Sequence, residues 1–227
     1  MLIACWVRTA HADIVNVLLA DRDVTALASI SGGTTTGMDQ KSSFDETPFN
    51  QSATSTSSGP PLSFASATIT ATQDSSFTNT SSLFDFTFAG SVSVNSTGTP
   101  MTTSQQISGD SDAKFEFTAS SNHPFTLTLT TTGVPPLGFT LTVTLTDETN
   151  PMTILFGSGA TSGALNAGDN YKLSIVGQEG WDVAAANNGT FIYHIDFAVV
   201  PEPDTLALLT LGGALGAFIC CRKSSHL

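Results

Sequence analysis

The sequence predicts an all-β protein, a jelly-roll-like antiparallel β-sandwich, followed by a C-terminal transmembrane helix. Charged residues make up only 11% of the chain and hydrophobic ones 40%. Ser, Thr, Gly and Asn dominate the remainder, which favours strands over helices. Along the middle of the chain apolar and polar residues alternate with period two, as they do in strands that bury one face. Near the C-terminus one apolar run is long enough to cross a bilayer.

The clearest strand pattern is Phe139–Thr146, in which every second residue is apolar and the residues between them are threonines. A strand of this kind buries its apolar row and exposes its hydroxyl row to water. The two prolines of residues 133–138 cannot continue a ladder, so this segment is predicted to reverse the chain. Similar alternation predicts strands at Phe84–Phe88, Phe115–Phe117, Phe125–Thr130, Tyr171–Ile175 and Phe191–Phe197.

Leu165, a turn over residues 166–170 and Tyr171 at the start of an alternating strand form a pattern that is frequent late in jelly-roll sandwiches. From about Ala113 to Val176 the chain resembles the prepeptidase C-terminal type of secreted β-sandwich. That resemblance implies an accessory module rather than a catalytic one.

Upstream, Ile14–Ile30 and Leu62–Ala71 are expected to supply further strands, whereas residues 31–37 and 51–61 have the composition of loops. The β-sandwich is therefore predicted to span residues 13–199, with a loop-rich N-terminal part up to about residue 61. Two facing sheets with about eight to ten strands in total would take the phenylalanines as their core.

Residues 1–12 are interpreted as the remnant of a signal peptide. Ala10-His11-Ala12 has the small residues that signal peptidase needs, and Asp13 would begin the mature chain. The basic n-region and a full apolar h-region do not precede it in this sequence. The alternative is an ordinary frayed N-terminus.

At the other end, Val200, Pro201, Glu202 and Pro203 precede an uncharged apolar run over residues 205–221. As a helix this run would be about 25 Å long, near the lower limit for crossing a bilayer. Arg222 and Lys223 follow it and would stay on the cytoplasmic side as a membrane stop. Everything upstream would then lie outside. The alternatives are a plain membrane anchor and, less compatible with the prolines, a buried core helix.

Residues 200–227 resemble the PEP-CTERM sorting signal, because a Pro-Glu-Pro triplet, a Leu- and Gly-rich apolar segment and terminal basic residues occur in that order. The resemblance implies recognition, and cleavage near Pro201-Glu202-Pro203, by an exosortase, a membrane enzyme found with exopolysaccharide production. Only two basic residues follow the apolar segment, and residues 224–227 trail behind them. The resemblance implies nothing about the activity of the preceding domain.

The net charge of −12 repels nucleic acid and anionic membrane surfaces, which argues against a DNA- or RNA-binding role. The three cysteines, Cys5, Cys220 and Cys221, lie near the two ends and leave the predicted domain without any. A domain without cysteines avoids wrong pairing in an oxidising compartment, which is compatible with export. Cys220 and Cys221 lack the further ligands of a zinc site.

No catalytic constellation is evident. A G-x-S-x-G elbow is absent, and the two histidines inside the predicted domain are His123 and His194. His194 and Asp196 would share the outward face of one strand, where they could bind a metal or relay a proton, although a solvated polar face is the commoner case. Acidic pairs occur at Asp21 with Asp23 and at Asp147 with Glu148, and chance pairs are expected among 19 acids.

Asp110 and Asp112, in the segment Gly109–Asp112, are interpreted as a turn that could hold calcium, because hard oxygen ligands on a turn suit that ion. The alternative is a solvated acidic turn, and no other cofactor is expected. Trp181, expected between two strands, is a candidate glycan contact, because loop aromatics stack on sugar rings. A tryptophan that covers one end of the core is the alternative.

The sequence therefore predicts a non-enzymatic structural or adhesion protein of the cell surface or extracellular matrix. Its precursor would be exported by the secretion translocon, inserted in the membrane through its C-terminal helix and sorted by an exosortase. One alternative is a secreted carbohydrate-binding protein associated with exopolysaccharide. A hydrolase with an unrecognised carboxylate pair is the other.

Overall fold

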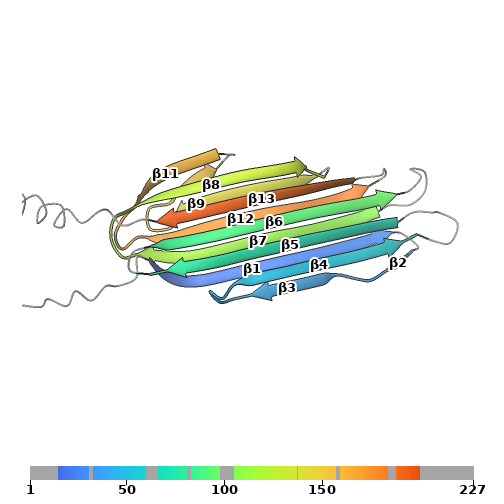
Figure 1. The fold of residues 1–227 in the computed structure, drawn as a ribbon, viewed down its shortest axis with the longest axis horizontal. Helices are drawn as coiled ribbons and strands as arrows, with labels where there is room; N and C mark the ends of the chain where they lie inside the picture. The colour runs from blue at the N-terminus through green and yellow to red at the C-terminus, as the bar shows by residue number, and fades with distance from the viewer. Residues whose placement is uncertain are drawn as a thin grey trace, which may run out of the picture.

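The computed structural model describes residues 15–30, 33–59, 66–80, 83–97, 105–136, 138–156, 159–183 and 188–199. These residues form two antiparallel sheets that face each other in an elongated β-sandwich (Figure 1). The predicted β-sandwich is thus confirmed, whereas the jelly-roll connectivity within that class stays a prediction.

The six-stranded sheet has the strand order β10-β9-β12-β7-β1-β3. Its strands are β1 (Val15–Ile30), β3 (Asp39–Ser43), β7 (Gln105–Ala119), β9 (Phe139–Asp147), β10 (Met152–Phe156) and β12 (Asn170–Val183).

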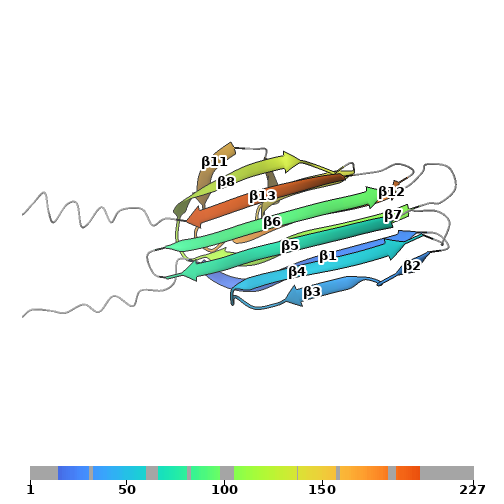
Figure 2. The same ribbon diagram turned by 45° about the vertical axis from the view of Figure 1, so that its right-hand side comes forward.

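The seven-stranded sheet has the order β11-β8-β13-β6-β5-β4-β2 and lies in front of the other in Figure 2. Its strands are β2 (Thr34–Thr35), β4 (Phe49–Ser58), β5 (Ser66–Asn79), β6 (Phe84–Thr97), β8 (His123–Val134), β11 (Gly159–Leu165) and β13 (Asn188–Val199).

The alternating segments are all strands, as predicted, but the loop predicted at residues 51–61 is wrong because residues 51–58 belong to β4. Part of the inward row of β4 is serine rather than apolar, which hides the strand pattern. Ser55 accepts a hydrogen bond at 3.0 Å from the backbone N–H of Ala28 on β1, and Ser57 accepts one at 3.0 Å from Ile30. These serines satisfy backbone groups of β1 beyond the end of its pairing with β3.

The core between the sheets is rich in aromatic rings. Phe115 on β7 lies 4.2 Å from Phe86 and 4.6 Å from Phe77, measured between ring centroids. A second, mostly aliphatic cluster fills the other half of the sandwich around Ile69 and Ile107, and Phe139 packs against both clusters. Alternate residues of both sheets meet in this layer, which is the arrangement that the period-two pattern predicts.

Arg22 is fully buried on the inward side of β1, a placement that the sequence does not predict. Its guanidinium lies over the rings of Phe49 and Phe77, at 5.3 and 5.6 Å from their centroids. It donates hydrogen bonds to Ser43 at 3.1 Å and to the carboxylate of Asp45 at 3.3 Å. Burial lowers the pKa of Arg22, and the charge of Asp45 opposes that shift. Arg22 therefore ties the segment between β3 and β4 to the core.

The first and last described residues, Val15 and Val199, lie at the same end of the sandwich, which we call the tail end (Figure 1). Asn79 donates a hydrogen bond to the carbonyl of Val15 at 3.2 Å, and Phe84 is paired with both Asn79 and Val199. No helix among the described residues is long and apolar enough to span a membrane. The predicted signal-peptide remnant, residues 1–12, and the predicted membrane span, residues 205–221, lie outside the described residues.

Candidate functional site

The outer face of the six-stranded sheet carries four aspartates, which we call the acidic cluster. β1 contributes Asp21 and Asp23, and β7 contributes Asp110 and Asp112. Asp23 lies directly opposite Asp112 in the strand register. Residues two apart on a strand share a face, so the remaining two carboxylates lie on the same side. Two acidic pairs that are far apart in the sequence thus become neighbours.

The turn predicted at Gly109–Asp112 is wrong, because these residues lie in the middle of β7. Their inward-facing members are small for a packing reason. A Cβ at Gly109 would lie 2.5 Å from Cδ1 of Ile69, and Ser111 donates a hydrogen bond to the carbonyl of Thr72 at 3.0 Å. Gly109 therefore leaves room for the side chain of Ile69, and Ser111 hydrogen-bonds to the backbone of the opposite sheet. Neither residue turns the chain.

Two aspartates of the acidic cluster have raised pKa values. Burial and the charge of Asp110 raise the pKa of Asp112 to about 7, although the backbone N–H of Gly177 donates a hydrogen bond to its Oδ1 at 3.1 Å. Burial and the charge of Asp23 also raise the pKa of Asp110. The cluster can therefore hold a proton at neutral pH. Beside it opens a hollow of about 330 Å³ lined by Asp21, Asp23, Asp112, Ala113, Lys114, Ser174, Ile175 and Val176.

Within the described part of the chain, no three Asp, Glu, His or Cys side chains lie close enough together to hold a metal ion. Calcium usually takes six to eight oxygen ligands, several of them from carboxylates. Calcium binding by Asp110 and Asp112 stays a prediction from the sequence.

Trp181 lies within β12, where it pairs with Ile107 of β7, so its predicted place between two strands is wrong. Its side chain falls outside the part of the structure that is described. The glycan contact predicted for Trp181 is therefore untested.

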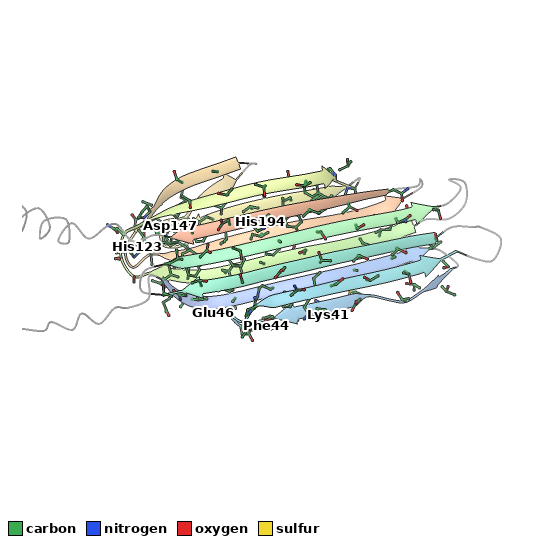
Figure 3. All side chains as sticks on the ribbon, viewed as in Figure 1. Lys41, Phe44, Glu46, His123, Asp147 and His194 are labelled. Carbon is green, nitrogen blue, oxygen red and sulfur yellow. The ribbon has the colours of Figure 1, made fainter. Side chains whose placement is uncertain are left out.

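On the outer face of the seven-stranded sheet, one register row crosses five strands through Asn50, Asp74, Ala89, His194 and Thr130. Figure 3 shows His194 in the middle of this sheet. A hollow of about 340 Å³, which we call the Ala89 hollow, opens on this face. It is lined by Asn50, Thr72, Gln73, Asp74, Ala89, Gly90, Ser91 and Ile192. No sequence motif reveals this group, because its residues come from four strands.

His194 and Asp196 are both exposed on that same face, as predicted. Asp196 has an acidic neighbour on β6, Asp85. Burial of Asp85, a hydrogen bond with Asp196 and the negative charge of Asp196 together raise the pKa of Asp85. The pair can share a proton across the two strands.

His123 and Asp147 lie at the tail end, away from His194 (Figure 3). His123 Nε2 is 2.7 Å from the hydroxyl of Ser121, and Asp147 accepts hydrogen bonds from the backbone N–H groups of Thr149 and Asn150 at 3.0 and 2.9 Å. The contacts of Asp147 are those of a carboxylate that shapes a turn. The structure thus separates His123 from His194 and brings Asp21 and Asp23 together with Asp110 and Asp112.

The sorting residues Val200, Pro201, Glu202 and Pro203 and the basic residues Arg222 and Lys223 lie outside the described residues, directly after β13. Residues 199–223 match the family model of the PEP-CTERM protein-sorting motif, which confirms the resemblance. Neither the curated proteins nor the solved structures contain a match to this chain. The resemblance of residues 113–176 to prepeptidase C-terminal modules stays a prediction.

Proposed function

We propose that this chain, which its sorting motif marks as an exported precursor processed by an exosortase, is a structural or adhesion protein of the cell surface or extracellular matrix without catalytic activity. The position of the motif carries the proposal. The match begins at Val199, which is the last residue of β13 and is fully buried in the core. The sorting signal therefore follows the folded domain with no linker between them.

The position of the tail end indicates how the domain would be oriented relative to the membrane. Residues 200–204 separate β13 from the apolar run and can reach about 17 Å when extended. A precursor inserted through residues 205–221 would hold its tail end close to the membrane. The opposite end would point away from it, and both outer faces of the sandwich would stay exposed. Such a geometry suits a domain that is presented to its surroundings.

The outer face of the seven-stranded sheet also supports a structural role. Hydroxyl groups pair across its strands, for example Thr72 with Ser91 at 2.6 Å and Ser93 with Thr190 at 2.9 Å. Each such pair contributes about 0.2 to 1 kcal/mol to sheet stability. A face of this kind is solvated, which suits a protein exposed outside a cell.

The test follows the fate of the full chain, supplied with a complete export signal, in an exosortase-containing host. The released protein should be smaller than the precursor and lack the residues after about Pro203. Deletion of the exosortase, or replacement of Pro201, Glu202 and Pro203 by alanine, should trap the uncut form in the membrane fraction. Replacement of Ser224 and Ser225 by alanine is the matched control and should leave processing unchanged.

Mass spectrometry of the released protein decides the outcome. An intact C-terminal tail on the released native protein would contradict exosortase processing. Hydrolysis of a polysaccharide by the purified chain, abolished by Asp85→Asn and Asp196→Asn, would contradict the non-catalytic part of the proposal.

A further inference from the structure

We propose that the Ala89 hollow binds one ring of a neutral hexose polymer. The proposal goes beyond the sorting and structural role and does not depend on it, because it concerns a site on the folded domain.

The dimensions of the hollow fit a sugar ring. Ala89 is paired in register with Asp74 on one side and with His194 on the other. Neighbouring strands lie about 4.8 Å apart, so β5 and β13, which contribute Asp74 and Ile192 to the lining, lie about 9.6 Å apart across Ala89. A pyranose ring with its hydroxyl groups fits this width. The volume of about 340 Å³ lies at the lower end of the range for small-molecule sites.

The lining has the chemistry that a sugar requires. Asp74 is an exposed carboxylate that can accept hydrogen bonds from two hydroxyl groups, and the amide of Asn50 can both donate and accept. Ile192 is 47% exposed and provides an apolar wall beside the polar row. A sugar ring presents both hydroxyl groups and an apolar C–H face, so it can use all three residues.

The charges of this face disfavour an anionic ligand. In the described part of the chain every lysine and arginine belongs to the six-stranded sheet, namely Arg22, Lys41, Lys114 and Lys172. The seven-stranded sheet carries Asp74, Asp85 and Asp196 on its outer face. Phosphate groups and acidic polysaccharides would therefore be repelled. A metal ion would lack a three-ligand set among the described residues.

The experiment uses the full chain, purified in a sugar-free detergent and titrated with cellohexaose, laminarihexaose and mannohexaose, with oligogalacturonate as the anionic probe. Calorimetry should detect binding of at least one neutral hexasaccharide and no binding of oligogalacturonate. Ala89→Leu, which fills the hollow, and Asp74→Asn, which removes the carboxylate, should each weaken the affinity at least about tenfold. Ala198→Leu adds the same side chain elsewhere on this face and should leave the affinity unchanged.

Thermal unfolding of each variant separates loss of the site from loss of the fold. The proposal is overturned if none of the three neutral hexasaccharides binds, or if Ala89→Leu binds as well as the parent chain. It is also overturned if oligogalacturonate binds more tightly than the neutral probes, or if Ca²⁺ or Zn²⁺ alone binds and Asp74→Asn abolishes that binding. None of these results bears on exosortase processing, which is measured separately in cells.

Discussion

The hydroxyl of Tyr193, on β13 of the seven-stranded sheet, donates a hydrogen bond at 2.7 Å to the backbone carbonyl of Ser111 on β7 of the other sheet. Tyr193 is fully buried, and burial raises its pKa. Its ring occupies space left by two glycines. A Cβ at Gly90 would lie 2.4 Å from Cζ of the ring, and one at Gly177 would lie 1.9 Å from the hydroxyl oxygen. This contact thus joins the hydrogen bonds of Ser55, Ser57 and Ser111 in linking the two sheets.

Tyr193→Phe should lower the free energy of unfolding by about 1 to 3 kcal/mol, because the buried carbonyl of Ser111 loses this donor. Urea unfolding followed by circular dichroism measures the change. Tyr171→Phe is the matched control. The hydroxyl of Tyr171 accepts a hydrogen bond from the N–H of Asn166, an exposed residue, so water can replace it and the loss should be smaller. Equal losses in the two variants would contradict the assigned role of Tyr193.

Gly177→Ala should destabilise the domain by about 1 to 3 kcal/mol, because the added methyl group overlaps the hydroxyl of Tyr193. In a double-mutant cycle, Tyr193→Phe removes the atom nearest to that methyl group and should recover part of the loss. Additive losses would show that the overlap with Tyr193 is not the cause.

The acidic cluster should make the domain more stable in mild acid. The pKa of Asp112 is about 7 when folded and about 3.9 when unfolded, so the folded state binds the extra proton between these values. Its contribution to stability is therefore largest near the acid end of this window and is lost as the pH rises towards 7. Asp112→Asn should make the free energy of unfolding, measured in urea, less dependent on pH between about pH 5 and about pH 8.

Asp39→Asn is the control for this pH dependence. A hydrogen bond from Lys41 lowers the pKa of Asp39, so its contribution changes only in stronger acid. Between about pH 5 and about pH 8, the free energy of unfolding of this variant should therefore change with pH as it does in the parent chain. A parent chain that gains stability as the pH rises through this range would refute the assignment of the proton to the cluster.

A flexible Gly-Ser linker inserted after Val199 should speed exosortase cleavage in cells. Val199 is fully buried between Phe84 and Phe125, its register partners on β6 and β8, so a membrane enzyme must approach the sorting residues beside the folded tail end. Pulse-chase labelling measures the rate. The same linker inserted at Gly168, in an exposed turn, is the control for added length. An unchanged rate after both insertions would mean that the folded domain does not restrict access.

The domain upstream of the sorting motif should lie outside the cytoplasmic membrane when a full export signal is present. An alkaline phosphatase fusion after Val199 should be active, because this enzyme needs an oxidising compartment for its disulfides. A cytoplasmic reporter at the same position is the control and should be inactive. The reverse result would refute the topology inferred from Arg222 and Lys223.

The fold class and the sorting signal can both be predicted from the order of residues alone. Period-two alternation depends only on neighbouring residues, so strands such as Phe139–Thr146 are visible without any knowledge of their partners. The sorting motif is similarly local, because its triplet, apolar run and basic residues follow one another. Strand β4 was hidden because Ser55 and Ser57 replace apolar residues and hydrogen-bond to a strand of the other sheet.

Which side chains meet depends on the packing of the strands in three dimensions. Asp23 and Asp112 become neighbours through the antiparallel register of β1 and β7, and Asn50, Asp74 and Ala89 through that of β4, β5 and β6. Register depends on how whole strands pack and where their connections end, and no short segment of the chain contains that information. Gly109 and Ser111 are residue types that are typical of turns, yet both face the core. Their partners there, Ile69 and the carbonyl of Thr72, belong to the opposite sheet and are not visible in the local sequence.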